Sequence, residues 1–571
     1  MLICGIHDGH NAAAALVKDG VLLGALQEER VTRVKNWMGF PAGALERLLI
    51  HHGLHLQDVD SFVFSGYYSA ATPGKGPGDR EAQVRAFKDM CSLRGDVHRR
   101  LRKTPLRDVV QRRRSSQRLN PLSALGVKRE RIHFIEHHRC HAATAAYGAS
   151  FDPDALIVTL DGAGDGICAS ISVYDKEGKL QRLATIAEKQ SIGILWALIT
   201  SLLGMVPLEH EYKIMGMAPY ASGKSVRDAA DRFASAFVYR DGMWDLASGV
   251  PEINYSYEFW RGKLEFVRFD AICAGLQLFT EELISRWIGD WLNKTGRRKL
   301  RLSGGVFMNV KLNKLLMERA EVEKIYVFPS CGDETNAIGA AWALLEDQSK
   351  SELIQPVGHF YLGTALAERA IEAASELARE KNFRVEKPAD IEAHVAELLA
   401  NGQIVARCDG AEEFGARALG NRSILADPSN PKVVQTINRA IKNRDFWMPF
   451  ACSVLAEAEE RYIANPGKAS APYMILAFDS RNTQEIVAGC HPEDGSIRPQ
   501  VVTEAHNPKY HRLLRLFMDR TGRGAVLNTS FNLHGEPIVS QPAEAVDVLE
   551  RSGLKYLALG GYLISKRTPQ L

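Results

Sequence analysis

Residues 299–309 read KLRLSGGVFMN, where an apolar strand pattern runs directly into a Gly-Gly turn. A helical pattern follows, VKLNKLLMERA. The same order recurs at 323–345, EKIYVFPSCGDETNAIGAAWALL, and a buried strand ending in a Gly/Asp loop is predicted at 155–166, ALIVTLDGAGDG. Repeated apolar strand ends followed by Gly/Asp loops are typical of an α/β nucleotide-binding fold with phosphate loops. We therefore predict an α/β protein.

The pattern on either side of these stretches predicts two domains. Residues 1–30 read as a β-meander, and helices are predicted at 41–52, 137–150 and 270–297, with a strand at 61–66. A polar linker, DQSKSELIQPVG, follows Glu346 at about 346–360, and helical patterns restart near 365–382 and 390–401. We expect one domain at 1–350, with a basic insertion at about 76–130, and a second domain at 361–571.

Composition excludes several classes of protein. Of the 571 residues 46% are hydrophobic and 24% charged, as in soluble globular proteins, and no run approaches 18 uninterrupted apolar residues. The first residues, MLICGIHDGHN, read as a strand and not as a signal peptide. Nine scattered Cys without a C-x-x-C predict reduced thiols and a cytoplasmic location, and exclude zinc-finger and disulfide scaffolds.

The net charge of +3 hides a basic stretch, which we call the Arg-rich segment, at 98–131. It holds 12 Lys/Arg and two acids, so the rest of the chain carries about −7. Such a stretch could bind nucleic acid phosphates or an anionic surface. The alternative, which we prefer, is a solvated insertion that covers a substrate site or packs in a dimer.

His137 and His141 form the clearest candidate for a metal site. On a helix their i, i+4 spacing places both imidazoles on one face, about 6 Å apart. The motif is not H-E-x-x-H, because His138 stands where a zinc peptidase has its general base. Asp161, at a strand end, and Asp333, in a loop before a helix, could complete the set, which suits iron, manganese or zinc better than copper. The alternative is two ordinary surface histidines.

Three further motifs are weaker on their own. The Gly-Gly of SGGVFMN, at 303–309, would let the backbone approach an adenosine or phosphate, or would serve tight packing. Cations cluster in RALGNRS, at 417–423, and KNRDFWMPF, at 442–450, as phosphate recognition requires. NTSFN, at 528–532, offers hydroxyl and amide groups at a strand end. P-loop and Rossmann fingerprints are absent from the sequence.

These motifs in this order resemble the NodU/CmcH family of O-carbamoyltransferases, which includes tobramycin carbamoyltransferase, nodulation enzymes and antibiotic-tailoring enzymes. The resemblance runs through HDGHNAAAAL, EERVTR, HHRCHAA, LDGAGDG, YKIMGMAPY, SGGVFMN, FGARALGNRSIL and LNTSFNLHGEPIV, and covers nearly the whole chain except 76–130. It implies an actin/Hsp70/sugar-kinase-like N-terminal domain, similar to the catalytic subunit of tRNA threonylcarbamoyladenosine synthesis. A YrdC-like adenylating domain follows.

The resemblance also implies a reaction. The second domain would make carbamoyladenylate from carbamoyl phosphate and ATP, with Mg²⁺ bound to ATP. The first domain would transfer the carbamoyl group to a hydroxyl of a small-molecule acceptor, helped by a divalent metal, Fe²⁺, on His137, His141, Asp161 and Asp333. Dimerisation is an expectation of the resemblance, and the sequence shows no interface signature.

Other residues match family positions. Gly193, Gly305 and Asn309 match adenylate-binding positions, and Asp8 and His10 match acceptor-side positions. His10 is our candidate general base, because imidazole is best matched to neutral pH. The ATP and carbamoyl phosphate pocket of the second domain is matched by Lys35, Arg417, Lys442, Arg444, Arg498, Asn528 and Ser530.

The sequence departs from the family at two positions. Met448 stands where the resemblance leads us to expect the Arg of R-P-F, so a phosphate-binding cation is missing, and either Arg444 compensates or the pocket holds carbamoyl phosphate differently. Asn36 stands where we expect His after the Lys. Neither change removes the metal set.

Two other functions compete with carbamoyl transfer. One is a fused tRNA threonylcarbamoyl enzyme that binds tRNA through the Arg-rich segment, and the other is a degenerate nucleotide-binding protein without catalysis. The intact metal and cation sets argue against lost catalysis, and RPQVVTEA with LNTSFN favours the small-molecule family, so we expect no nucleic acid partner. The sequence does not identify the acceptor, because acceptor contacts lie in variable loops.

Overall fold

The computed structural model describes residues 1–68, 87–89, 91 and 117–567. The chain forms two compact units, of which the first comprises Met1–Glu28 and Asn36–Val357 and the second comprises Glu29–Lys35 and Gly358–Leu571. The expected insertion at 76–130 and the Arg-rich segment lie outside the described residues, except for 87–89, 91 and 117–131. The fold is mixed α/β, as the sequence predicts.

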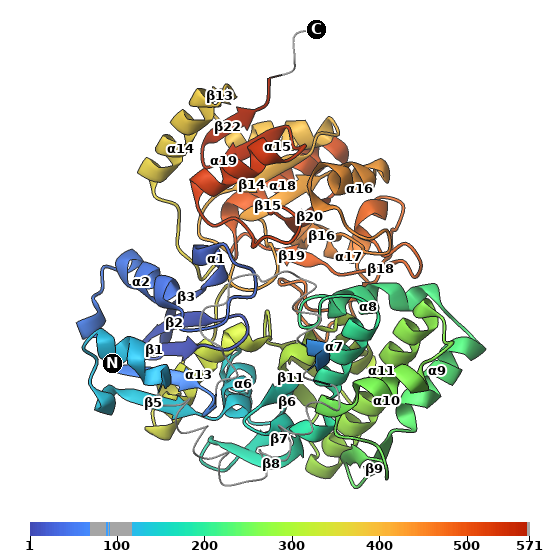
Figure 1. The fold of residues 1–571 in the computed structure, drawn as a ribbon. Coiled ribbons are helices and arrows are strands. Elements are labelled where there is room, and N and C mark those ends of the chain that lie inside the picture. Colours follow the sequence, from blue (N-terminus) through green and yellow to red (C-terminus); the bar gives the residue numbers. More distant parts are fainter. Residues whose placement is uncertain (69–86, 90, 92–116, 568–571) are drawn as a thin grey trace. The chain divides into compact units, whose positions relative to one another are not determined.

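The first unit contains two five-stranded sheets that repeat one topology (Figure 1). Each sheet begins with three consecutive antiparallel strands. Two further strands, parallel to the first of these three, extend the sheet on the free side of that first strand. The first sheet has the order β3-β2-β1-β4-β5, with β1 Leu2–His7, β2 Ala13–Lys18, β3 Val21–Gln27, β4 Ser61–Ser65 and β5 Ile132–Ile135. The second has the order β12-β11-β6-β7-β8, with β6 Ala155–Gly164, β7 Ile167–Tyr174, β8 Leu180–Ala187, β11 Lys299–Ser303 and β12 Lys324–Val327.

The meander predicted for residues 1–30 is confirmed, and its tight turn explains the register. Lys18 pairs with Val21, so Asp19 and Gly20 alone connect β2 to β3. Both have positive φ, 49° and 83°, which matches the twist of a two-residue hairpin turn. β1 is buried throughout, β2 as far as Val17 and β3 from Gly24 to Gln27, so most of the meander lies in the interior of the unit.

Two buried helices connect the sheets. α13 (Asn336–Asp347) packs on β1, β2 and β4, α6 (His137–Tyr147) packs on β6 and β11, and the two helices pack on each other. They can approach closely because α13 is rich in Ala and Gly: a Cβ on Gly339 would meet the carbonyl oxygen of Cys140 at 2.1 Å. This packing holds the N-terminal end of α6 and the loop before α13 close to the strand ends.

The remaining elements of the first unit lie outside this centre. The helices are α2 Ala42–His51, α7 Ile192–Leu202, α8 Glu211–Met217, α9 Lys224–Ala234, α10 Tyr257–Lys263, α11 Phe269–Thr295 and α12 Val310–Glu318. A hairpin is formed by β9 Phe237–Arg240 and β10 Met243–Leu246. The helix predicted at 270–297 is thus confirmed as α11, which ends at Gly296 in the left-handed conformation typical of a helix C-terminus.

The second unit is built on one eight-stranded sheet with the order β13-β22-β21-β14-β15-β20-β16-β19. Its strands are β13 Arg384–Glu386, β14 Val405–Cys408, β15 Arg422–Ala426, β16 Ala451–Leu455, β19 Gln500–Val502, β20 Ala525–Ser530, β21 Tyr556–Leu559 and β22 Tyr562–Ser565. Its helices are α1 Glu29–Thr32, α14 Glu368–Glu380, α15 Ile391–Ala400, α16 Lys432–Ile437, α17 Glu459–Tyr462, α18 Pro508–Thr521 and α19 Pro542–Arg551. β17 Phe478–Asp479 and β18 Ser496–Ile497 form a small separate ribbon.

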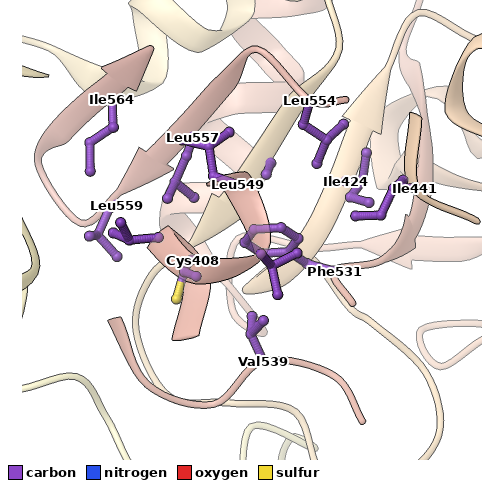
Figure 2. Close-up of a cluster of buried hydrophobic side chains, with 14 of the residues drawn as sticks. Cys408, Ile424, Ile441, Phe531, Val539, Leu549, Leu554, Leu557, Leu559 and Ile564 are labelled. Carbon is purple, nitrogen blue, oxygen red and sulfur yellow. The ribbon is translucent and has the colours of Figure 1, made fainter. Parts of the chain in front are cut away.

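Figure 2 shows the apolar core between the large sheet and its helices. Cys408, Ile424 and Leu557 project from the strands, and Leu549 comes from α19. Such burial is the main favourable contribution to folding of the unit. Within the described residues no helix combines the length and the apolar character that crossing a bilayer requires.

The structure corrects the expected end of one strand. Asp161 was expected at a strand end, but β6 continues to Gly164, and its pairing with β7 breaks register between Leu160 and Gly164. Such irregular pairing bends a strand and redirects side chains. The motif at 528–532 lies at a strand end, as predicted, because β20 ends at Ser530.

Candidate functional site

The first candidate site begins at the N-terminus of α6, which is held by carboxylates. Glu136 accepts hydrogen bonds from the backbone N–H groups of His138 and Arg139, at 2.8 and 3.0 Å, and Asp165 accepts one from His137, at 2.9 Å. Carboxylates at these positions satisfy free backbone donors and favour the helix dipole. The helix therefore starts at His137, and His137 and His141 occupy one face.

The structure brings the four predicted metal ligands together. One ligand atom from each of His137, His141, Asp161 and Asp333 lies within 4.8 Å of the others. Asp333 Oδ1 is 3.3 Å from Nε2 of both histidines, and Asp161 Oδ2 is 3.3 Å from Nε2 of His137. Both imidazoles are buried, so these are not ordinary surface histidines. His138 points elsewhere and bonds with Thr159 and the carbonyl of Ile167.

The protonation pattern also fits a cation. Burial lowers the pKa of His137, but the carboxylates of Asp333 and Asp161 outweigh burial and raise that pKa well above its usual value. Burial raises the pKa of Asp333, but His137 and His141 outweigh it and bring the pKa well below its usual value. Asp333 Oδ1 is buried and accepts no hydrogen bond from the described residues. A divalent cation would satisfy this oxygen and replace the proton on His137.

Neighbouring groups orient two of the four predicted ligands. Ser303 Oγ lies 3.3 Å from Nδ1 of His141 and 2.8 Å from the hydroxyl of Thr144. The backbone N–H of Gly305 donates to Asp161 Oδ1, at 2.7 Å. Hydrogen bonds of this kind fix the orientation of metal ligands. Asn336 Nδ2, by contrast, is 3.1 Å from Nε2 of His141, the nitrogen that faces Asp333.

The predicted adenylate-binding residues adjoin the same set. Gly305 binds Asp161 as above, and a Cβ on Gly193 would come within 2.7 Å of the carbonyl oxygen of Asp161. Asn309 caps α12, where its Oδ1 accepts from the N–H of Leu312 and its Nδ2 donates to Gln277. The side chain of Asn309 therefore already serves the fold, whereas the two glycines let the backbone pack closely against Asp161.

The loop after β1 carries the predicted acceptor-side residues. Asp8 is buried and paired with Arg118, whose Nε and Nη2 donate to the two carboxylate oxygens at 2.7 and 2.6 Å. The carbonyl oxygen of His10 lies 3.0 Å from Nε2 of His7. His7, whose Nε2 lies 3.8 Å from Asp333 Oδ2, is not among the residues predicted from the sequence, and neither are Arg118 and Asn336.

The signals for these missed residues differ in strength. His7 and Asn336 stand within three residues of predicted site residues, so the HDGHN and DETN motifs could have identified them. Arg118 has no such signal, because it lies in a stretch read as a solvated insertion.

The second candidate site lies in the second unit and begins with a segment from near the start of the chain. The residues of Glu29–Lys35 belong to this unit. Arg33 donates to the carbonyl oxygens of Pro537 and Ile538, at 2.8 and 2.7 Å, and Arg30 donates to that of Gly415, at 2.7 Å. These contacts hold Lys35 in the unit that carries the other predicted phosphate-binding residues.

Cations crowd together in this second site. Lys442 is only 2% exposed and donates to Ser530 Oγ and Asn532 Oδ1, at 3.0 and 2.7 Å. Burial, followed by the charges of Arg444 and Lys35, brings the pKa of Lys442 well below its usual value. Burial, followed by the charges of Arg417 and Arg444, likewise lowers the pKa of Arg498. Arg444 is therefore close to both groups, and a polyanion would relieve the repulsion.

Polar groups on β20 complete the second site. Asn528 Nδ2 donates to Ser453 Oγ and the carbonyl of Ala418, while its Oδ1 is buried and accepts no hydrogen bond from the described residues. Nη2 of Arg444 reaches Thr529, at 3.3 Å. Met448 is buried and adds no charge. All seven residues predicted for this pocket thus belong to the second unit, although no contact joins every pair of them.

Two family models match the chain, one in its N-terminal part and one in its C-terminal part. The family described as Carbamoyltransferase N-terminus matches residues 2–342, and the one described as Carbamoyltransferase C-terminus matches 396–566. The chain belongs to the carbamoyltransferase family. The expected NodU/CmcH resemblance is thereby confirmed, and membership supports a transferase.

Individual relatives agree with this assignment. Nodulation protein NolNO of Sinorhizobium fredii is 31% identical over 98% of this chain and 79% of its own length. An uncharacterized protein of Synechocystis sp. is 30% identical over 98% of this chain and 95% of its own length. Among solved structures, an activator of the 2-hydroxyisocaproyl-CoA dehydratase from Clostridium difficile is 13% identical over 62% of this chain and 99% of that chain, with a TM-score of 0.34. A score this low assigns no fold family.

Proposed function

We propose that this carbamoyltransferase is an ATP-dependent O-carbamoyltransferase that works through carbamoyladenylate. The second unit, with a YrdC-like role, forms carbamoyladenylate from carbamoyl phosphate and ATP, and the first unit, with an actin/Hsp70/sugar-kinase-like fold, transfers the carbamoyl group to a hydroxyl. One observation carries the proposal: two residue sets scattered along the sequence converge separately, the metal set in the first unit and the cation set in the second.

The cation set suits the first half-reaction. For the atoms to balance, carbamoyl phosphate and water yield carbamate and phosphate. Carbamate oxygen then attacks the α-phosphorus of ATP, so that a C–O–P bond forms and pyrophosphate leaves. Two phosphate-containing substrates carry many negative charges, and Lys442, Arg444, Arg498, Arg417 and Lys35 would bind them and offset the charge that gathers on the leaving pyrophosphate. Asn528 Oδ1, which is buried and accepts no hydrogen bond from the residues that the structure describes, could accept from the carbamoyl NH₂.

The metal set suits the second half-reaction, in which the acceptor oxygen attacks the carbamoyl carbon and AMP leaves. A divalent cation on His137, His141, Asp161 and Asp333 would supply Lewis-acid stabilisation of the leaving phosphate. The chain's own groups bind and orient: Gly193 and Gly305 pack closely on Asp161, and their backbone is proposed to bind the adenylate there. His10 is proposed to take the proton from the acceptor hydroxyl as general base.

Arg118, in the described part of the Arg-rich segment, gives no support to the nucleic acid alternatives. It is buried and bound to Asp8, so its guanidinium is not available to phosphates at the surface. Lys128 and Arg129 of the same part are exposed, as they would also be on a solvated insertion. The small-molecule acceptor therefore stays the preferred substrate class, in a cytoplasmic setting, with Mg²⁺ on ATP and Fe²⁺ as the proposed metal at the transfer site.

The decisive experiment omits the acceptor. Purified protein is mixed with ATP, Mg²⁺ and carbamoyl phosphate, and pyrophosphate is measured while carbamoyladenylate is sought by mass spectrometry. We expect pyrophosphate only when carbamoyl phosphate is present, and its loss in Lys442→Met but not in Lys432→Met, which removes an exposed lysine of α16. Pyrophosphate only with bicarbonate and threonine would overturn the proposal in favour of a threonylcarbamoyl enzyme.

A further inference from the structure

Arg118, in the described end of the Arg-rich segment, is built into the first sheet and is only 7% exposed. Its guanidinium carbon lies 4.9 Å from the ring centre of Phe64 on β4 and 5.2 Å from that of Phe134 on β5. These two rings stack on each other, with centres 5.3 Å apart. A guanidinium packed on aromatic rings is immobilised as well as stabilised.

The polar atoms of Arg118 join the ends of two neighbouring parallel strands. Besides its two bonds to Asp8, which follows β1, Arg118 donates from Nη1 to the carbonyl oxygen of Gly66, at 2.7 Å, and from Nη2 to that of Ser65, at 3.1 Å. The carboxyl ends of parallel strands are the part of an α/β sheet where ligands bind. Arg118 thus bridges the carboxyl ends of β1 and β4, two hydrogen-bonded neighbours that lead to Asp8 and Gly66.

This pairing decides what Asp8 can do. Both carboxylate oxygens are engaged by one rigid fork, and Asp8 is only 5% exposed. Asp8 therefore serves as an anchor for its own backbone. Its carbonyl oxygen in turn accepts a hydrogen bond from the N–H of Gly39, at 3.1 Å.

The anchored loop leads to the metal set. His7 stands next to Asp8, its Nδ1 lies 2.7 Å from Ser65 Oγ, and its Nε2 lies 3.0 Å from the carbonyl of His10 and 3.8 Å from Asp333. Ser65 is also bound by Arg118 through its carbonyl. Arg118 and His7 therefore hold the loop His7–Asn11 through shared partners, beside a metal ligand.

We propose that Arg118 is a positioning residue of the carbamoyl-transfer site, which fixes Asp8 and thereby the loop that carries His10 next to the metal ligands. The inference rests on the proposed function for its catalytic meaning, but its structural part does not. It gives the end of the Arg-rich segment a role in the acceptor site of this chain, and it makes Asp8 an anchoring carboxylate.

The test compares Arg118→Ala and Arg118→Lys with Lys128→Ala, which removes a neighbouring but exposed cation. Amide hydrogen exchange is measured in the loop His7–Asn11, together with the electron paramagnetic resonance spectrum of Mn²⁺ bound at the histidine–aspartate set. We expect exchange in this loop to rise by about tenfold or more in Arg118→Ala. The Mn²⁺ spectrum should change, Arg118→Lys should lie between, and added guanidinium ion should restore both readouts in Arg118→Ala.

The third readout is the ratio of AMP release to pyrophosphate release. The protein is supplied with ATP, carbamoyl phosphate and, as the hydroxyl probe, glycerol. Displaced loops cost about 100-fold in rate when reacting groups move by about 1 Å, so the AMP-to-pyrophosphate ratio should fall while pyrophosphate release persists. Unchanged exchange and an unchanged Mn²⁺ spectrum in Arg118→Ala would overturn the inference. If Arg118→Ala does not fold, Arg118→Lys decides by the same two readouts.

Failure of the proposed function has a different signature. Absence of pyrophosphate release in the unsubstituted protein would refute the adenylate mechanism, while the exchange and Mn²⁺ readouts would still decide whether Arg118 positions the loop.

Discussion

The imidazole of His137 lies directly against the backbone of Gly164: a Cβ built on Gly164 would come within 2.1 Å of His137 Cγ. Gly164 closes the irregular end of β6, three residues after Asp161. No flexible side-chain end can yield here, because the contact is to the base of the ring. The position of this predicted metal ligand therefore depends on the absence of a side chain at residue 164.

We accordingly expect Gly164→Ala to lower divalent-cation affinity by about tenfold to 100-fold, as disturbed ligand orientation does elsewhere. The measurement is titration calorimetry with Mn²⁺, accompanied by thermal unfolding. Gly262→Ala is the matched control, because residue 262 lies in α10 with nothing within 4 Å of a new Cβ. Equal Mn²⁺ affinity in both variants would show that His137 is not a ligand.

The sequence predicts much of this arrangement because the relevant signals are local. The meander, the helices α6, α11 and α13 and the strand-to-loop junctions follow from apolar periodicity and from turn residues such as Asp19 and Gly20. The i, i+4 spacing of His137 and His141 is likewise a local property. Periodicity and spacing require no knowledge of tertiary contacts.

What the sequence does not reveal depends on contacts between distant parts of the chain. Glu29–Lys35 joins the second unit through backbone carbonyls at Pro537 and Ile538, and carbonyl acceptors leave no trace in residue types. Arg118 reads as one of many arginines, and only the fold shows that it is buried against Asp8. Asp161 was expected at a strand end because the register break in β6 has no distinct sequence pattern.

Asp333 supports a prediction about pH as well as affinity. Its Oδ1 lies 3.3 Å from Nε2 of both His137 and His141, so Asp333→Asn removes a ligand and should weaken Mn²⁺ binding by more than about tenfold. The carboxylates raise the pKa of His137, so protons compete with the cation and affinity should rise with pH, by up to about tenfold per unit for each proton released.

The same substitution should move this pH dependence to lower pH, because Asp333 is the main carboxylate that raises the pKa of His137. Calorimetry at several pH values measures both effects. His51→Ala, which removes an exposed histidine of α2, should change neither. A pH-independent Mn²⁺ affinity in the unsubstituted protein would argue against cation binding at this set.

At Lys442 we expect anion affinity to change with pH in the direction opposite to that of Mn²⁺ affinity. Its pKa is well below that of an unfolded lysine because of burial and the charges of Arg444 and Lys35. Between the two pKa values the unfolded chain binds more protons, so stability should rise with pH and be lost as pH falls through the folded pKa. Bound pyrophosphate favours the charged amine, so binding should take up about one proton and weaken by up to about tenfold per pH unit above the depressed pKa.

Calorimetry in buffers of different ionisation enthalpy measures this proton uptake, and thermal unfolding against pH measures the stability. Lys442→Met should abolish the uptake and flatten both profiles, whereas Lys432→Met should leave them intact. Proton release on pyrophosphate binding would contradict the assignment of Lys442 to the anion site.

Arg444 is a candidate to supply the positive charge that Met448 lacks. The pKa of Lys442 and that of Arg498 are both lowered by the charge of Arg444, and Nη2 of Arg444 also lies 3.3 Å from the hydroxyl of Thr529. Its guanidinium carbon is 5.1 Å from the ring centre of Phe450, so the side chain is packed in place. Arg444 therefore stands where a phosphate between Lys442 and Arg498 would need a third cation, while Met448 is buried and neutral.

If Arg444 replaces the cation that Met448 lacks, Arg444→Met should raise the KM for carbamoyl phosphate by about tenfold or more, the worth of one charge-assisted contact. The exposed Arg439 provides a control of equal charge, because Arg439→Met should leave KM unchanged. In the Arg444→Met background, Met448→Arg should restore part of the affinity, because it returns a cation to the same loop. Equal KM values in Arg444→Met and Arg439→Met, with no gain from Met448→Arg, would instead mean that the pocket holds carbamoyl phosphate without a third cation.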